Sequence, residues 1–221
     1  YKYDDKYLLT YKGKSNQNAI FIDDGGRAYS VQSHTLPSAR GQGEPLSGRL
    51  TVPAGMGFKG LVMGPDEDHY LMATDAGYGF ITQLKDIQTK NKAGKAMLTV
   101  PTNAKVLSPA KVDAIEKAWI AAISNEGRML VFPAADLPVM GRGKGNKMIS
   151  IPGPRASSRE ELMIAAVAFS ETDTLLVHSG KRHTKLKFSD LEHYFGERGR
   201  RGNKLPRGFQ NVDMVEIAKK D

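Results

Sequence analysis

The sequence predicts an all-β fold, a propeller-like array of about four to five small sheets with four strands each. Three observations lead to this prediction. A pair of strand-like apolar runs joined by a glycine-bearing turn occurs four times, a Thr or Asp followed by a branched aliphatic residue comes after each pair, and a segment rich in glycine and basic residues comes next. A repeat of about 50 residues with short strands buries its faces only against its neighbours, as propellers do.

The four paired runs have the pattern of β-hairpins. In each pair, two apolar stretches flank a turn in which Gly, Asp or Asn supplies the positive φ angles that tight turns require. One more apolar run precedes each pair. The third and fourth of these runs, taken alone, also fit helices, but the repeat register favours strands. The pairs are residues 19–31, 70–82, 120–132 and 174–186, and the preceding runs are residues 6–11, 58–64, 111–119 and 162–169.

The residues that follow the hairpins keep a regular spacing. The anchors are Thr35-Leu36, Asp86-Ile87, Asp136-Leu137 and Asp190-Leu191, and their first members lie 51, 50 and 54 residues apart. Each unit then closes on an apolar residue followed by proline, at Val52-Pro53, Val100-Pro101, Ile151-Pro152 and Leu205-Pro206. This regularity indicates four copies of one structural unit.

The repeats predict a single domain over residues 1–221. Its units are expected at about 6–53, 56–101, 105–152 and 160–208, with a leftover strand within residues 209–221. A further module is then either completed by the N-terminal residues or absent from the chain. The first residue is Tyr1 and not methionine, which suggests a piece of a longer protein.

Composition excludes several classes of protein. The chain has no cysteine, so it holds no disulfide and no metal–sulfur site, and its five histidines lack the spacing of metal ligands. No stretch approaches the roughly 18 apolar residues of a membrane span, so we expect a soluble protein without membrane partners. Neither a metal, a cofactor nor a catalytic residue is expected. A net charge of +8 favours a polyanionic partner, nucleic acid first.

The positive charge is concentrated in the equivalent segment of every repeat. Residues 38–49, 88–95, 141–147 and 196–207 hold thirteen Lys or Arg and two Glu, a net +11 in 39 residues. Equivalent segments of an array fall on one rim, so short basic runs would join into a stripe that follows a phosphate backbone. Glycines there would let backbone N–H groups approach phosphate oxygens. The expected DNA contacts are Arg40, Arg49, Lys90, Lys92, Lys95, Arg142, Lys144, Lys147, Arg198, Arg200, Arg201, Lys204 and Arg207.

Four stretches carry a resemblance to a known family. Residues 35–48 (TLPSARGQGEPLSG), 74–80 (TDAGYGF), 141–147 (GRGKGNK) and 196–202 (GERGRRG) resemble the C-terminal domain of the A subunit of bacterial topoisomerase IV, and more distantly that of gyrase A. The resemblance runs along the whole chain. It implies a β-pinwheel, a propeller-like disc whose blades exchange a strand with their neighbours, with double-stranded DNA bent around a basic outer rim.

The same resemblance implies the setting in which the domain works. The strand-breaking and ATP-consuming parts of such enzymes lie in other domains, so this chain alone is not expected to be an enzyme. Its partners would be duplex DNA, bound with little sequence preference, the remainder of the A subunit, and the ATPase subunit, in the bacterial cytoplasm at the nucleoid. The expected role is to grip and bend DNA so that the enzyme selects its substrate topology, as in decatenation and supercoil relaxation.

One motif departs from the gyrase pattern. Gyrase A domains carry a box reading Gln-Arg-Arg-Gly-Gly-Lys-Gly that is tied to chiral wrapping of DNA. The nearest segment is residues 196–202, with glutamate at the second place of the box, glycine at the fourth and arginine at the fifth. This departure favours bending over gyrase-type wrapping. A gyrase-like wrapping domain and a protein-binding propeller remain open as alternatives, and an enzymatic propeller would need convergent polar residues that the sequence does not offer.

Overall fold

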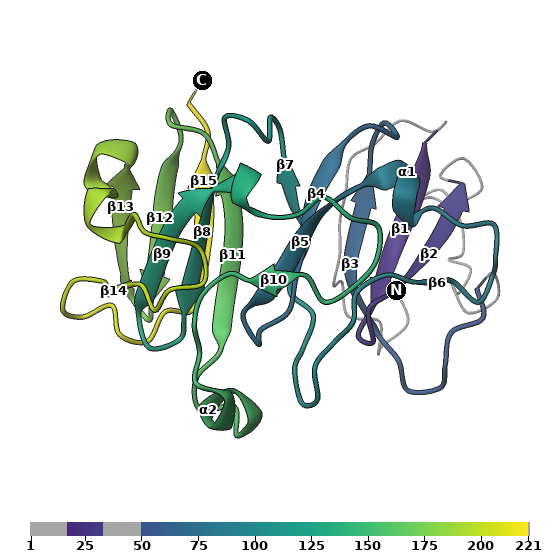
Figure 1. Cartoon of the computed structure of the whole chain (residues 1–221), viewed down its shortest axis with the longest axis horizontal. Coiled ribbons are helices and arrows are strands. Elements are labelled where there is room, and N and C mark those ends of the chain that lie inside the picture. The colour runs from purple at the N-terminus through teal and green to yellow at the C-terminus, as the bar shows by residue number, and fades with distance from the viewer. Residues whose placement is uncertain (1–16, 33–49, 221) are drawn as a thin grey trace.

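Four antiparallel sheets lie side by side in the computed structural model, which describes residues 17–32 and 50–220 (Figure 1). We number the sheets 1 to 4 in chain order. Sheet 1 has the order β3-β1-β2-β6, formed by Phe58–Met63, Asn18–Asp23, Arg27–Gln32 and Lys95–Ala96. Sheet 2 has the order β10-β5-β4-β7, formed by Asn146–Lys147, Tyr78–Gln83, His69–Ala73 and Ala110–Val112. The predicted all-β, propeller-like fold is thereby confirmed.

The other two sheets continue the array towards the C-terminus. Sheet 3 has the order β11-β8-β9-β14, formed by Met163–Phe169, Trp119–Ser124, Arg128–Pro133 and Asn203–Lys204. Sheet 4 has three strands in the order β13-β12-β15, formed by Arg182–Lys187, Thr174–Ser179 and Met214–Ala218. The run at 111–119 forms a strand only at its start, in β7, and at its end, where β8 begins. The run at 162–169 is a strand along almost its whole length, β11.

Each sheet combines strands from two successive repeats. The central hairpin of sheet 1 comes from the first repeat, whereas β3 and β6 come from the second. β3 pairs with β1 in the register Phe21↔Leu61, and β6 pairs with β2 in the register Arg27↔Ala96. Sheets 2 and 3 repeat this exchange. A repeat therefore cannot complete a sheet alone. The apolar runs that open the second, third and fourth units each contribute a strand to the sheet of the unit before.

The strand at the C-terminal end follows the same rule. β15 pairs with β12 from Thr174↔Ala218 to His178↔Met214. This segment is the strand that the repeat pattern leaves outside its four units, and in the structure it is the third strand of sheet 4. The equivalent N-terminal run, residues 6–11, lies outside the described residues.

A short helical turn follows the second strand of each described hairpin from β5 onward. The turns are α1 (Leu84–Ile87), η3 (Ala134–Asp136) and η4 (Phe188–Asp190). The aliphatic anchors Ile87, Leu137 and Leu191 are 0%, 4% and 0% exposed. The repeated Asp-aliphatic pair thus marks the point where the chain leaves the hairpin, and its aliphatic side chain packs into the core. Two other helical segments, α2 (Gly153–Ser157) and η5 (Glu192–Tyr194), lie in connections.

Both faces of the middle sheets are buried because side chains alternate along a strand. In β8, Ile120 and Ala122 join the core between sheets 2 and 3, whereas Ala121 and Ile123 join the core between sheets 3 and 4. The outward face of sheet 4 carries charged and polar side chains together with the exposed Met214, and His178 Nε2 lies 2.9 Å from Glu216 Oε2 there. Within the described residues, no helix is long and apolar enough to span a membrane.

We expect the interface between sheets 2 and 3 to support the whole array. Phe132 is 0% exposed there. Phe132→Ala should lower the free energy of unfolding by about 3–5 kcal/mol, since it removes a large side chain and leaves a cavity. Urea denaturation followed by circular dichroism measures this loss, with Lys117→Ala, at an exposed turn, as the control. A loss below about 1 kcal/mol would show that the sheets do not depend on this contact.

Candidate nucleic-acid interface

The basic segments of successive repeats are joined to one another by backbone hydrogen bonds. The amide of Thr51, just after the first segment, donates to Lys92 O over 2.8 Å. The second segment meets the third through two bonds, Gly143 N to Met97 O at 2.9 Å and Thr99 N to Gly143 O at 2.9 Å. The second and third segments, about 45 residues apart in sequence, therefore lie edge to edge. The first segment lies outside the described residues.

The third and fourth segments are joined in the same way. Gly199 N donates to Met148 O over 3.0 Å, and Ser150 N donates to Arg200 O over 2.9 Å. Residues 88–99, 141–150 and 196–207 thus form one continuous band, which we call the basic strip. Figure 1 shows its edge strands β6, β10 and β14 at the same height across the molecule.

The strip is also fixed to the hairpin turns of the preceding repeats. In sheets 1 to 3, the carbonyl of the turn glycine accepts a hydrogen bond from a backbone N–H just after the two-residue edge strand. The donor is the second residue after β6 and the first residue after β10 and β14. These bonds are Leu98 N to Gly26 O at 2.8 Å, Met148 N to Gly77 O at 2.7 Å and Leu205 N to Gly127 O at 2.8 Å. The turns that the sequence predicts therefore position the strip as well as close the hairpins.

The close approach of strip and hairpin requires glycine at one equivalent position in the second, third and fourth repeats. Gly94, Gly145 and Gly202 precede the three edge strands and have φ angles of +77°, +83° and +74°. A Cβ at Gly145 would lie 2.1 Å from Gly79 O. Glycine is needed here because the backbone of the strip packs against the backbone of the hairpin, a reason that lies within the fold.

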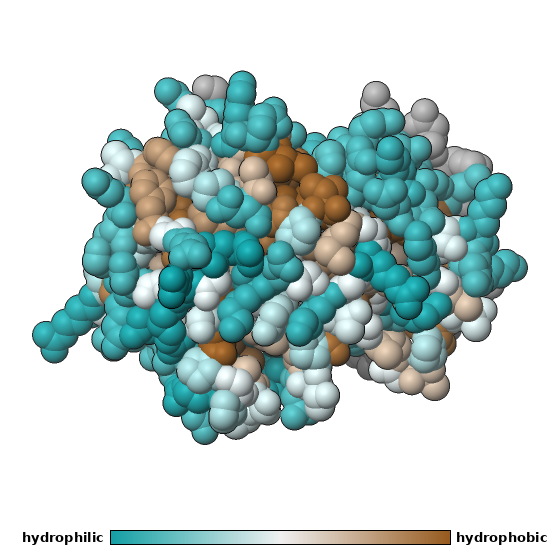
Figure 2. Space-filling view, viewed as in Figure 1, coloured by the Kyte–Doolittle hydropathy of each residue, from teal (hydrophilic) through white to brown (hydrophobic). Residues whose placement is uncertain are grey.

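Most of the predicted basic contacts lie in the strip with exposed side chains. Arg198 and Arg201 are half-buried, and Arg40 and Arg49 lie outside the described residues. The exposed ones are Lys90, Lys92, Lys95, Arg142, Lys144, Lys147, Arg200, Lys204 and Arg207. Figure 2 shows a largely hydrophilic surface along the line of β14, β10 and β6, beside an apolar patch near β4 and β7. The fold therefore gathers nine cationic side chains along one band.

Several of these cations have partners within the protein. Lys144 Nζ lies 4.3 Å from the centroid of the Tyr78 ring, and Lys95 Nζ donates to Asp86 O over 2.6 Å. Arg200 pairs with Glu197 at 3.1 Å. That pair is exposed on both sides, so water screens it and it holds Arg200 only weakly.

Two arginines that the sequence analysis did not single out contribute to the same band. Arg27 Nε and Nη2 donate to Ala93 O and Gly94 O over 3.1 and 3.0 Å, and Arg128 Nη1 donates to Gly202 O over 3.1 Å. Both arginines directly follow a turn glycine. This recurrence in the first and third repeats was visible in the sequence and was the signal that could have identified them.

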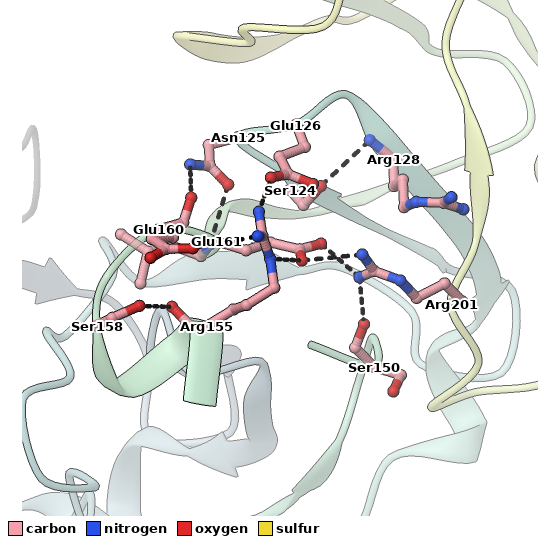
Figure 3. Close-up of polar contacts among 11 residues, drawn as sticks. Ser124, Asn125, Glu126, Arg128, Ser150, Arg155, Ser158, Glu160, Glu161 and Arg201 are labelled. Atoms are coloured by element: carbon pink, nitrogen blue, oxygen red, sulfur yellow. Dashed lines mark hydrogen bonds and ion pairs between the residues drawn. The ribbon is translucent and has the colours of Figure 1, made fainter. Parts of the chain in front are cut away.

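Arg201 differs from the other basic residues of the strip because its guanidinium binds a buried carboxylate (Figure 3). Arg201 Nη2 donates to Glu161 Oε2 over 2.8 Å, and Arg201 Nη1 contacts Oε1 of the same carboxylate. Burial by itself raises the pKa of Glu161, but hydrogen bonds and charge from Arg201 and Arg155 outweigh it and lower that pKa overall. The positive charge of Arg201 is therefore paired with Glu161 within the protein and does not face the solvent as a free cation.

The described residues show no grouping suited to metal chemistry. Among residues 17–32 and 50–220, no three His, Asp or Glu side chains are placed to hold a metal ion. The chemical capacity of the site is that of a row of cations and backbone groups, which suits a polyanion.

We expect Gly145→Ala to disturb the strip. The substitution combines a strained φ angle with a Cβ too close to Gly79 O, so the free energy of unfolding should fall by about 1–3 kcal/mol. Gly153→Ala is the matched control, since nothing lies within 4 Å of its added Cβ. It should leave stability unchanged or raise it slightly. Denaturant titration of both variants measures the difference, and equal effects would contradict the packing role of Gly145.

Comparison with known proteins places this geometry in a family. A family model described as the DNA gyrase C-terminal domain, beta-propeller, matches residues 68–113 and 118–167. The A subunit of DNA topoisomerase 4 from Pseudomonas aeruginosa is 52% identical over 100% of this chain and 30% of its own length. The corresponding protein of Haemophilus influenzae is 48% identical over 98% of this chain and 29% of its own length. The chain thus spans about 30% of the length of these relatives.

A solved structure from the same group of proteins matches this chain along nearly the whole length of both chains. The C-terminal domain of Escherichia coli ParC is 44% identical and superposes with a TM-score of 0.90, covering 100% of this chain and 89% of that one. Identity at this level over both chains shows common descent as well as a common fold. The chain belongs to the family of C-terminal domains found in the A subunits of DNA topoisomerase IV, which is related to the gyrase A C-terminal domains.

Proposed function

We propose that this domain binds double-stranded DNA along the basic strip and bends it. The observation that carries the proposal is the continuity of the strip, in which backbone hydrogen bonds join three basic segments and nine exposed Lys or Arg side chains line the result. Duplex DNA carries one negative charge per about 1.7 Å of its axis, so a row of cations can engage successive phosphates. Membership of a topoisomerase family supports DNA as the polyanion.

The proposed binding has little sequence preference. Lysine and arginine side chains on short edge strands suit phosphate oxygens, and sequence is read mainly by elements that enter a groove. The described residues offer no long helix for the major groove. Specificity would therefore come from the shape of the DNA, in particular from how easily it bends.

In the whole protein, we propose that this domain is a non-catalytic part of a type II topoisomerase that acts with an ATPase subunit. Residues 1–221 would work as one DNA-gripping unit in the bacterial cytoplasm, at the nucleoid. By holding and bending a DNA segment, the domain would set which crossings the enzyme acts on, favouring decatenation and supercoil relaxation. The family of the chain and its share of the relatives' length support this division of labour.

The first test is the salt dependence of DNA binding. If five to eight phosphates are contacted, log K should fall with log salt at a slope of about −4.5 to −7. Replacing Lys147 and Lys204, which occupy equivalent places in β10 and β14, by alanine should weaken binding and reduce the slope by about 2. Fluorescence anisotropy with a labelled duplex at several salt concentrations measures both quantities.

The matched control removes the same charge elsewhere. Lys117 and Lys187 are exposed and lie outside the strip, so their joint replacement by alanine should leave the slope nearly unchanged. Equal effects of the two double variants would mean that net charge, and not the strip, drives binding. A slope near zero for the unmodified domain would reject DNA binding and favour the protein-binding propeller.

The second test separates bending from wrapping. Smooth bending of a 20–30 base-pair site by 40–90° costs about 1–6 kcal/mol, which a few charge-assisted contacts at about 1.5–3 kcal/mol each can offset. A lasting chiral wrap needs a longer grip, and no copy of the basic segment reproduces the gyrase box. We therefore expect the domain to bend linear DNA but to change the linking number of a relaxed plasmid very little.

This expectation is measured by relaxing a plasmid with a nicking–closing enzyme in the presence of the domain. A gyrase A C-terminal domain, assayed in parallel, supplies the reference for wrapping. A linking-number change per bound domain as large as the reference would contradict bending without wrapping and support the gyrase-like alternative.

A further inference from the structure

We propose that the buried carboxylate of Glu161 is a positioning group, which acts through Arg201 to hold residues 198–202 of the basic strip in the geometry that binds DNA. This inference rests on the DNA-binding function proposed above. It assigns to Arg201 a role different from that of its neighbours Arg198 and Arg200, although sequence alone treats all three as equivalent phosphate contacts.

The geometry around Glu161 is that of a built ion-pair site. Its side chain is 0% exposed, and the two nitrogens at the end of the Arg201 fork face its two oxygens. Arg201 Nη1 also donates to Ser150 O over 2.8 Å. A buried carboxylate is stable only when it is paired and hydrogen-bonded, and a two-pronged arginine pair fixes orientation as well as charge.

A second arginine ties this carboxylate to the body of the fold (Figure 3). Arg155, in α2, places Nε 3.3 Å from Glu161 Oε2 and Nη1 3.1 Å from Glu160 Oε2. Its Nη2 contacts Glu126, in the turn between β8 and β9. Glu161 therefore links the strip, α2 and the hairpin turn of sheet 3 through two guanidinium groups.

The part of the strip held by this link is where two basic segments meet. Gly199 N to Met148 O and Ser150 N to Arg200 O are the backbone bonds that join them, and they lie within two residues of Arg201. Arg198 Nη1 donates to Lys147 O over 2.7 Å in the same stretch. If Arg201 lost its anchor, these bonds would loosen, and the neighbouring cations would lose their fixed spacing.

Positioning and simple electrostatics make opposite predictions when Glu161 is neutralised. Glu161→Gln removes one negative charge from a domain of net charge +8, so charge alone would strengthen DNA binding. Positioning predicts weaker binding, because Gln is uncharged and keeps only one acceptor oxygen, so it cannot hold both guanidinium groups. The sign of the change therefore decides between them.

The experiment compares Glu161→Gln with Glu116→Gln, which removes the same charge at an exposed turn. Two measurements are made on the folded domain: the affinity for a duplex of 30 base pairs at fixed salt, and hydrogen–deuterium exchange without DNA. We expect Glu161→Gln to bind about tenfold more weakly, as if one charge-assisted contact were lost. Exchange at Gly199 and Ser150 should be faster in this variant. The control should exchange like the unmodified domain and bind DNA as tightly or slightly more tightly, since only its charge has changed.

A second variant keeps the net charge and removes only the fork. Arg201→Lys cannot hold both carboxylate oxygens and Ser150 O in the same way, so it should also bind DNA more weakly and exchange faster at Gly199. This variant decides the matter if Glu161→Gln proves unfolded by circular dichroism.

Two results would overturn the proposal. One is DNA binding by both variants as tight as, or tighter than, that of the unmodified domain. The other is unchanged exchange at Gly199 and Ser150 in both variants. If the unmodified domain did not bind DNA, the proposed function would fail first, whereas the exchange measurements would still test whether Glu161 holds the strip.

Discussion

The structure depends on one constraint: a hairpin of this chain cannot satisfy its edges with strands of its own repeat. β1 and β2 need β3 on one side and β6 on the other, and both come from the next repeat. An unpaired strand edge leaves backbone N–H and C=O groups without partners, so exchange is the means by which each sheet is completed. Because the basic segment supplies the second exchanged strand, the same exchange brings positive charge to the edge of every complete sheet.

The exchange also explains why the basic segments form one band. A segment that pairs with the hairpin before it must pass close to the segment of the neighbouring repeat, and the bonds at Gly143 and Gly199 lie at these passages. Backbone hydrogen bonding thus fixes the spacing of the cations more firmly than side-chain contacts between exposed charges could. Flexible lysines then sit on a backbone whose position is set by the β-structure.

The arginines of the strip divide into two groups. Arg142 and Arg207 are exposed, whereas Arg198 and Arg201 donate to backbone carbonyls or to a buried carboxylate. Arg27 and Arg128, which belong to the adjacent hairpins, donate to carbonyls of the strip in the same way. The planar guanidinium suits such fixed contacts because it presents several donors in a rigid fork. Residues 196–207 carry more basic residues than any other segment, yet Arg201 is held internally and Arg200 faces Glu197. The charge count of a segment therefore exceeds the charge it offers to DNA.

The sequence by itself determined the repeat, the hairpins, the all-β class and the family, because periodic apolar runs, turn glycines and the Asp-aliphatic anchors are local signals. It also located the basic segments. Only the tertiary structure decided which strand belongs to which sheet, since pairing partners such as β1 and β3 lie in different repeats and no local pattern specifies them. For the same reason, the sequence left β15 without a sheet and treated Arg201 as one more phosphate contact. Its partner Glu161 lies 40 residues away in the chain, and the two meet only because the strands between them fold back into sheets 3 and 4.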